Sequence, residues 1–183
     1  GDDILQDYIG TFQDAVVYED AEDGDNVGWT IFGNNAAAAS VLSVDDDAQH
    51  GKAMVMLGNG KVNGYQLKKA DGSWWENKTH SVIEWEMNYR EAVSVIVYVN
   101  TSAGVKFLTY QPTSEAASIT SWNAWYYLGM GERVHDGVWH TIQRDISADL
   151  ARAIPVSTPT LISIRGIAFL GSGKIDNIRL TEK

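Results

Sequence analysis

Six short segments in which apolar and polar residues alternate constrain the fold of this chain more than any other feature. They are rich in β-branched and aromatic residues and are separated by Gly, Asn, Asp and Ser. A period of two is typical of β-strands that have one buried and one solvated face. Many short strands joined by turns predict an antiparallel β-sandwich or jelly roll, rather than a parallel α/β sheet. The segments are residues 81–89, 92–100, 104–111, 139–146, 160–171 and 174–180.

Alternation also assigns the two faces of individual strands. In the first segment it buries Trp85 and exposes Glu84 and Glu86, and in the second it buries the valines and exposes Tyr98. The same reasoning assigns Trp139 to the core. One face of each strand is therefore predicted to pack inward and the other to meet water.

Residues 147–154 are the one helix-like segment of the chain. Ser147 is a suitable N-cap, and Pro155 ends the segment because proline cannot continue a helix. The stretch NNAAAAS, residues 34–40, is instead predicted as a loop leading into a strand, because Gly33 and the two asparagines favour a turn.

The size and composition of the chain fit a single domain. It has 183 residues, of which 44% are hydrophobic and 21% charged, which is ordinary for a globular protein with a buried core. We therefore expect one domain over residues 1–183, with its core over about 16–180. No apolar run approaches the roughly 20 residues needed to cross a bilayer.

The charge balance and the lack of cysteine exclude several classes of function. The formal net charge is −10, whereas nucleic acids and anionic membranes bind basic patches. We therefore expect neither nucleic acid nor a membrane as a partner. A chain without cysteine has no disulfide, no thiolate metal site and no cysteine nucleophile. Hard cations are the more natural partners of so acidic a chain.

Two runs of acidic residues lie where loops are expected. The first begins at Glu19, and the second is Asp45, Asp46 and Asp47. A solvated acidic surface is the usual role of such runs. Calcium binding is the alternative, because Ca²⁺ takes about six to eight oxygen ligands from carboxylates and backbone carbonyls. Neither run has EF-hand spacing, so a calcium site would be assembled from segments distant in sequence.

An excess of aromatic residues points to a sugar-binding surface. The chain has seven tryptophans and eight tyrosines, and sugar-binding sites stack flat rings on pyranose faces while polar groups bond the hydroxyls. The stretch SWNAWYY, with Trp122 and Trp125, is one candidate platform. Alternation offers another, in which Tyr98 and Tyr110 share the solvated face of a sheet. Packing in the core or at its rim is the alternative for each ring.

Catalysis has less support in the sequence. The four histidines are scattered, and none lies in a His-Glu-x-x-His motif or beside a Gly-x-Ser-x-Gly elbow. Glu84 and Glu86 point to the same strand face, about 7 Å apart, and are the one candidate acid pair for a polysaccharide hydrolase or lyase. A local patch that includes Lys106, Arg144 and Arg165 would favour an anionic polymer, which the net acidity of the chain disfavours.

The order of several motifs resembles a known family of sugar-binding proteins. VYEDAEDGDNVGW near the start is followed by a central segment that runs from GKAMVML to IEWEMN, then by GVWHTIQRDI and GKIDNIRL. Together they resemble the jelly-roll carbohydrate-binding modules of galactose-binding-like fold, family 11 being the nearest, that are attached to bacterial polysaccharide-degrading enzymes. The last two motifs also resemble laminin-G-like sandwiches of concanavalin type, an alternative fold in the same all-β class.

The resemblance implies a structural calcium ion. In such modules an early Glu, the loop before a Gly-Lys pair and an Asp of the final strand converge on the metal. The residues implied here are Glu19, Asp47, Gly51, Lys52 and Asp176. Asp176 would then tie the last strand to the first, which accounts for a carboxylate in an otherwise apolar and basic strand.

The resemblance also implies that Tyr65, in the GY strand, lies in a glycan cleft. The expected function is that of a non-catalytic module that targets a secreted, extracellular bacterial enzyme to its polysaccharide, with the catalytic domain of that enzyme in the same chain. An adhesin-type module and a polysaccharide hydrolase or lyase are the alternatives. The candidate ligand-binding residues are Tyr65, Tyr98, Tyr110, Trp125, Trp122, Glu84, Glu86 and Arg165.

Overall fold

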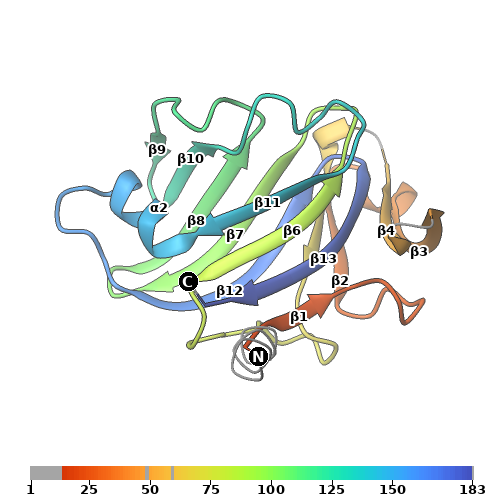
Figure 1. Cartoon of the computed structure of the whole chain (residues 1–183), viewed down its shortest axis with the longest axis horizontal. Coiled ribbons are helices and arrows are strands. Elements are labelled where there is room, and N and C mark those ends of the chain that lie inside the picture. Colours follow the sequence, from red (N-terminus) through yellow and green to blue (C-terminus); the bar gives the residue numbers. More distant parts are fainter. Residues whose placement is uncertain (1–13, 48–49, 59, 183) are drawn as a thin grey trace, which may run out of the picture.

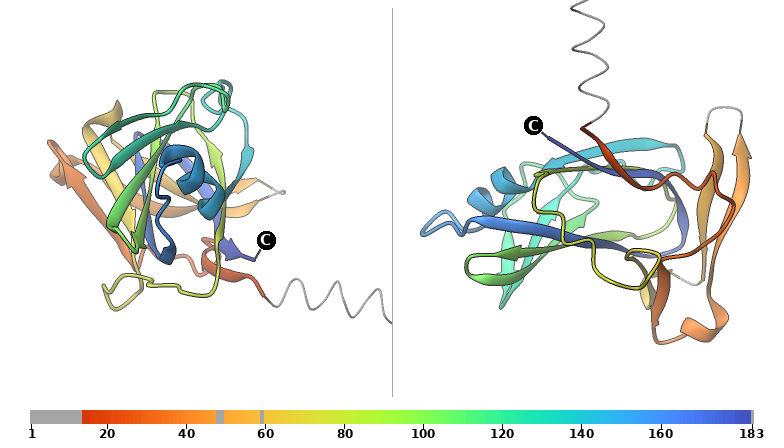
Figure 2. Two further views of the ribbon diagram at one scale, coloured as in Figure 1. Left: turned by 90° about the vertical axis from the view of Figure 1, so that its left-hand side faces the viewer. Right: turned by 90° about the horizontal axis from the view of Figure 1, so that it is seen from below.

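The computed structural model describes residues 14–182 except 48, 49 and 59, and shows two β-sheets packed as layers (Figure 2). The first sheet has six strands. They are β1 (Val16–Glu19), β3 (Ser40–Asp47), β4 (Gly51–Leu57), β6 (Val82–Asn88), β11 (His140–Asp145) and β13 (Gly173–Thr181). Its order is β11-β6-β13-β4-β3, and β1 also pairs with β13.

The second sheet has seven strands in the order β2-β5-β12-β7-β8-β10-β9. They are β2 (Trp29–Gly33), β5 (Asn63–Leu67), β7 (Ser94–Thr101), β8 (Gly104–Gln111), β9 (Thr120–Trp122), β10 (Trp125–Gly129) and β12 (Leu161–Leu170). β10 runs parallel to β8, whereas the other strand pairs of the described chain are antiparallel.

The prediction of an all-β sandwich is confirmed, and each of the six alternating segments forms a strand: β6, β7, β8, β11, β12 and β13. The predicted faces of β6 are also confirmed, as is the inward face of β7, but the opposite face of β7 is not solvated, because Ile96 and Tyr98 on it are buried as well. Trp85, Val95, Val97 and Val99 are fully buried, while Glu84 lies on the outer side. Burial of the alternate apolar residues is therefore what holds each strand against the opposite sheet.

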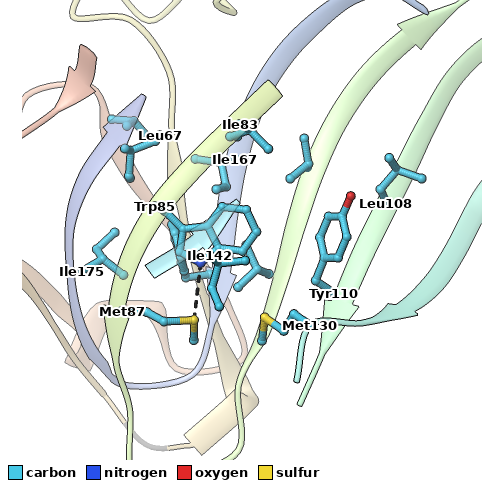
Figure 3. Close-up of a cluster of buried hydrophobic side chains, with 14 of the residues drawn as sticks. Leu67, Ile83, Trp85, Met87, Leu108, Tyr110, Met130, Ile142, Ile167 and Ile175 are labelled. Atoms are coloured by element: carbon cyan, nitrogen blue, oxygen red, sulfur yellow. Dashed lines mark hydrogen bonds between the residues drawn. The ribbon is translucent and has the colours of Figure 1, made fainter. Parts of the chain in front are cut away.

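Trp85 lies in the middle of the core between the two sheets (Figure 3). Its indole N–H donates to the Met87 sulfur at 3.3 Å. Its ring packs against Tyr110 and Phe169 of the opposite sheet, at centroid distances of 5.9 and 6.4 Å. These tilted and edge-on contacts are the favourable geometries of aromatic pairs, so the three rings join the two layers.

The predicted helix is present as α2 (Ile146–Ala153), which lies at the opposite end of the sandwich from the β3–β4 hairpin (Figure 1). Its N-cap is Asp145 rather than Ser147, and the Asp145 carboxylate accepts a hydrogen bond from the Ala148 N–H at 3.1 Å. Residues 34–40 form the predicted loop, with a 3₁₀ turn at η1 (Ala36–Ala38) before β3. A second 3₁₀ turn, η2 (Gly60–Val62), precedes β5. Within the described chain, no helix has the length and apolar character required to span a membrane.

The buried carboxylate of Asp149 anchors α2 to both sheets. It accepts two hydrogen bonds from the Arg144 guanidinium, at 2.7 and 2.9 Å, and one from the Tyr110 hydroxyl at 2.6 Å. Arg144 comes from β11 and Tyr110 from β8, so one helical residue joins one strand of each layer. Burial and the neighbouring carboxylate of Asp149 raise the pKa of Tyr110 well above its usual value.

Candidate functional site

A row of aromatic side chains crosses the outer face of the seven-stranded sheet. The strand register places Trp122 of β9 beside Trp125 of β10, Trp125 beside Phe107 of β8, and Phe107 beside Tyr98 of β7. Trp74, from the segment before β6, continues the row, and its ring centroid lies 5.2 Å from that of Tyr98. We call Trp74, Tyr98, Phe107, Trp125 and Trp122 the aromatic row.

The aromatic row is separate from the core, because adjacent residues of the same strands point inward. Val97 and Leu108 belong to the central core cluster, whereas Tyr98 and Phe107 form a second cluster on the opposite side of the sheet. Phe107 stacks on Trp125 at 4.3 Å and meets Tyr98 edge-on at 5.6 Å. The row is therefore a continuous apolar surface across several strands.

Exposure increases from Tyr98 towards the sheet edge. Tyr98 is only 8% exposed, while Trp122 on the edge strand β9 is 68% exposed. A large, exposed indole beside partly buried rings is a suitable platform for an apolar ligand face. Trp122 is the ring with the greatest area available to a ligand.

The opposite end of the row is basic. The Lys68 ammonium lies 4.2 Å from the Trp74 ring centroid and the Arg165 guanidinium carbon lies 4.7 Å from it. Arg165 Nε donates to the Glu76 carboxylate at 2.6 Å, and the Ser163 hydroxyl donates to it at 2.8 Å. Partial burial would raise the pKa of Glu76, but these two hydrogen bonds outweigh it and the pKa lies below its usual value.

Two predicted tyrosines lie in the core rather than on the solvated face. Tyr65 is fully buried, and its hydroxyl donates to the Leu57 carbonyl at 3.0 Å. Tyr110 is also fully buried, because the β7–β8 register pairs it with Val95 of the core face, while the outward partner of Tyr98 is Phe107. Neither ring is available to stack on a sugar, so their prediction as surface residues is wrong.

The two glutamates predicted as an acid pair lie on the six-stranded sheet, away from the aromatic row. Glu84 accepts hydrogen bonds from Arg179 at 2.8 Å and from Gln143 at 3.3 Å. Glu86 accepts one from the Asn177 amide at 2.8 Å, and its carboxylate lies 3.1 Å from His50 Nε2. Each carboxylate therefore has its own set of partners on a different layer from the sugar-binding candidate.

The calcium ligands implied by the resemblance are only partly brought together. Glu19 accepts hydrogen bonds from the Trp29 indole at 2.7 Å and the Ala21 N–H at 3.2 Å, and burial raises its pKa. The Lys52 N–H donates to Glu22 at 3.0 Å. In the described part of the chain, Glu19 belongs to no group of three metal-binding side chains.

Asp47 and Gly51 are two more of the calcium ligands that the resemblance implies. The Asp47 side chain lies outside the description. Gly51 borders the Glu22 carboxylate, whose oxygen lies 2.9 Å from the point where a Cβ would stand.

Asp176 instead meets His50 and Glu86. One ligand atom from each of these three side chains lies within 4.8 Å of the others. Asp176 is almost fully buried, and burial is the main reason why its pKa rises to about 7, with the charge of Glu86 adding to the effect against a backbone hydrogen bond from Asn177. We call His50, Glu86 and Asp176 the Asp176 cluster.

Trp139 borders the Asp176 cluster. The prediction that it lies in the core is wrong, because it is only partly buried. Its ring stacks on that of His50 at a centroid distance of 4.0 Å and an interplanar angle of 18°. Its indole N–H donates to Asp46 at 3.1 Å, and Asp46 also binds the Lys174 ammonium. Alternation failed here because Trp139 immediately precedes β11, where the strand pattern no longer fixes the side-chain direction.

Sequence reasoning found Tyr98, Trp125, Trp122 and Arg165 for the aromatic row and its basic end, but missed Phe107 and Lys68. Phe107 could have been found from the short turn between β7 and β8, because a two-residue hairpin fixes the register and hence the partner of Tyr98. Lys68 carried no such signal, because only the folded loop places it against Trp74.

Comparison with known proteins supports the fold. No family model matches the chain, and no curated protein sequence matches it. Among solved structures it is similar to the family 30 carbohydrate-binding module of the cellulosomal cellulase Cel9D-Cel44B from Clostridium thermocellum. The TM-score is 0.53 at 10% identity, over 92% of this chain and 98% of that one.

Two further structures from Clostridium thermocellum are similar. One contains the CBM22-1-GH10 modules of an endo-1,4-beta-D-xylanase, solved with xylohexaose, with a TM-score of 0.51 at 12% identity over 92% of this chain and 28% of that one. The other is a family 11 module in complex with a beta-1,3-1,4-mixed-linked tetrasaccharide, with a TM-score of 0.47 at 17% identity over 92% and 95% of the two chains. The chain therefore has the jelly-roll β-sandwich fold of carbohydrate-binding modules.

Proposed function

We propose that this chain is a non-catalytic carbohydrate-binding module that binds a polysaccharide through the aromatic row. The single observation that carries the proposal is the row of rings on the outer face of one sheet, in which Trp74, Tyr98, Phe107 and Trp125 pack together and Trp122 is the cross-strand neighbour of Trp125. Neighbouring strands are about 4.8 Å apart, so a glycan lying across the exposed end of the row would meet Trp125 and Trp122 on adjacent strands. The fold shared with carbohydrate-binding modules agrees with this role.

The expected mode of binding follows from the row. Exposed faces and edges of Trp122 and Trp125 would stack on pyranose rings, as aromatic side chains do with flat apolar faces. Arg165 and Lys68, at the Trp74 end, would donate hydrogen bonds to hydroxyl or carboxylate oxygens of the sugar. The acidic protein thus presents two basic groups where the ligand is proposed to bind.

We include in the proposal that the module belongs to a secreted bacterial enzyme and brings its catalytic domain to the polysaccharide. Two similar structures support this part of the proposal: one is a module joined to a xylanase catalytic module, and the other comes from a cellulosomal cellulase. Binding without turnover concentrates an enzyme on its insoluble or polymeric substrate by raising the effective concentration of the tethered partner.

A structural calcium ion stays a prediction of the sequence resemblance. In its favour, Asp176 is a buried carboxylate on the last strand, and the Glu22 carboxylate accepts the Lys52 N–H beside Gly51. One observation speaks against Glu19 as a calcium ligand: its carboxylate already accepts hydrogen bonds from the Trp29 indole and the Ala21 N–H.

The proposed function is tested by affinity electrophoresis on gels that contain mixed-linked β-glucan, xylan or mannan. Retardation by at least one polymer is expected, and replacement of Trp122 by Ala should weaken binding by about tenfold or more, since loss of one aromatic anchor typically costs about 1–3 kcal/mol. The melting temperature should stay close to that of the unchanged chain because Trp122 is 68% exposed.

Phe32→Ala is the matched control. Phe32 is a partly exposed ring on β2 in the same sheet, outside the aromatic row, and is 40% exposed. This variant should bind as well as the unchanged chain. Equal affinity for Trp122→Ala, Trp125→Ala and the unchanged chain on every retarding polymer would exclude the aromatic row as the binding site.

A further inference from the structure

We infer that the Asp176 cluster is a binding site for a divalent transition-metal ion of the zinc type. The inference concerns the six-stranded sheet, opposite the aromatic row, and does not rest on the proposed sugar binding. It assigns Asp176 of β13 to a ligand set with Glu86 of β6 and His50, which directly precedes β4, rather than to the calcium ligands that the resemblance implies.

The strand geometry brings the two carboxylates together. Asp176 of β13 and Glu86 of β6 are direct partners in the antiparallel register, so their side chains leave the sheet on the same face. On the other side of β13, Asp176 has no strand partner. β4 pairs with β13 only as far as Ile175, and the pairing with β1 begins at Ile178. His50, which directly precedes β4, brings a ring nitrogen within 4.8 Å of the ligand atoms of Asp176 and Glu86 at this place.

The donor set suits zinc better than calcium. Calcium takes only oxygen ligands and about six to eight of them, whereas zinc accepts imidazole nitrogen together with carboxylate oxygen, usually in a tetrahedral arrangement. Zinc–ligand distances near 2.0–2.1 Å place neighbouring ligand atoms about 3.3 Å apart. His50 Nε2 and Glu86 Oε2 are 3.1 Å apart, and the three ligand atoms lie within 4.8 Å of one another, so only a small inward shift of side chains is needed.

Neighbouring residues hold the three side chains in place. The Trp139 ring stacks on His50 and fixes the plane of the imidazole. The Asn177 side-chain amide donates to Glu86 at 2.8 Å and to Asp176 at 3.4 Å, which keeps the two carboxylates near each other. Outer partners of this kind orient metal ligands and are part of known zinc sites.

The charges of the two carboxylates also favour a bound cation. Two carboxylates on adjacent strands repel each other when both are ionised and withdrawn from water, and Asp176 is only 1% exposed. A divalent ion would balance both charges at once. A pocket of about 340 Å³, lined by His50, Glu86, Trp139, Thr141 and Asn177, adjoins the site and leaves room for a water molecule as a fourth ligand.

The whole chain, stripped of metal with chelator and dialysed, would be titrated calorimetrically with ZnCl₂ and, separately, with CaCl₂. We expect one zinc bound per chain, with an affinity at least tenfold greater than that for calcium, and a higher melting temperature with zinc because the metal binds only the folded state. Co²⁺ should produce visible absorption bands of a tetrahedral site with nitrogen and oxygen ligands.

His50→Ala should weaken zinc binding by about a hundredfold or more, since even outer partners of metal ligands cost tenfold to a hundredfold. His140→Ala is the matched control, because His140 also lies beside one carboxylate, at 2.7 Å from Asp136, but outside the cluster. This variant should bind zinc as the unchanged chain does. Glu86→Gln is the second test variant. The Glu86 side chain lies on the outer face of the sheet, and the glutamine that replaces it is neutral but of the same size.

Three results would overturn the inference. Calcium bound as tightly as zinc, and unaffected by His50→Ala, would show an oxygen-only site. Equal loss of zinc binding in His50→Ala and His140→Ala would show unspecific binding to surface histidines. No binding of either metal by a chain that is folded, as judged by its circular dichroism, would show that the cluster is a simple His–Glu ion pair. Each outcome can be read without any sugar, so it leaves the proposed function unaffected.

Discussion

Among single residues, Asp149 should be the costliest polar residue to remove. Its carboxylate pairs with Arg144 and accepts the Tyr110 hydroxyl, all in a buried setting. Asp149→Ala leaves a buried guanidinium without its main partner, and breaking a buried pair in this way typically costs about 3–5 kcal/mol. Urea unfolding should show this loss in the free energy of unfolding.

Tyr110→Phe separates the ion pair from the neutral hydrogen bond. It removes one hydroxyl but leaves Arg144 and Asp149 paired, so the loss should be only about 1 kcal/mol, the usual net value of one hydrogen bond. A loss as large as that of Asp149→Ala would mean that the tyrosine, and not the ion pair, anchors α2.

The pH dependence of sugar binding should follow Glu76, which positions Arg165 against Trp74. The pKa of Glu76 lies below the usual 4.5, so the folded state favours its ionised form. The contribution of the Glu76–Arg165 ion pair to sugar affinity is therefore present above pH 4.5 and is lost as the pH falls through the lowered pKa of Glu76. Affinity should be level from pH 7 to about 5 and decline below 4.5, whereas Glu76→Gln should remove that decline. The same low-pH decline in Glu76→Gln would assign it to another group.

At the scale of elements, β10 is held in place by the close approach of a loop to Gly129. A Cβ at Gly129 would stand 2.0 Å from the Ser114 carbonyl oxygen, and this neighbour is backbone rather than a movable side chain. Gly129→Ala should shift β10, lower the free energy of unfolding by about 1–3 kcal/mol and also weaken sugar binding, because β10 carries Trp125. Thermal melts and affinity electrophoresis would check both effects. Unchanged values in both would show that the loop moves aside freely.

The strands themselves could be predicted from the sequence, because each buries one alternating face, but the partners across strands could not. Tyr98 and Tyr110 both lie at outward positions if each strand is considered alone. The turn between Thr101 and Gly104 sets a register in which Tyr98 faces Phe107 and Tyr110 faces the core. His50 is a similar case, since it lies outside the strands and only the folded chain brings it to Asp176. A shift of one residue in the register therefore decides on which side of the sheet a ring lies.

For the whole molecule, the placement of Glu84 and Glu86 on a different sheet from the aromatic row predicts binding without hydrolysis. Glu84 is paired with Arg179, and Glu86 belongs to the Asp176 cluster, so neither faces the aromatic row. No reducing ends should be released from any polysaccharide that retards the chain on a gel. Turnover that disappears in Glu84→Gln or Glu86→Gln would contradict this prediction and favour a hydrolase or lyase.

The pairing of β1 with β13 has a mechanical consequence. Val16, near the start of the described chain, lies opposite Leu180, near its end, in an antiparallel register. A pull applied to the two ends would load this pair at one extremity, so its hydrogen bonds would break one after another, as in a zipper, rather than all together in shear. A tether attached through both ends should therefore detach β1 at low force, while the strands that carry the aromatic row remain folded.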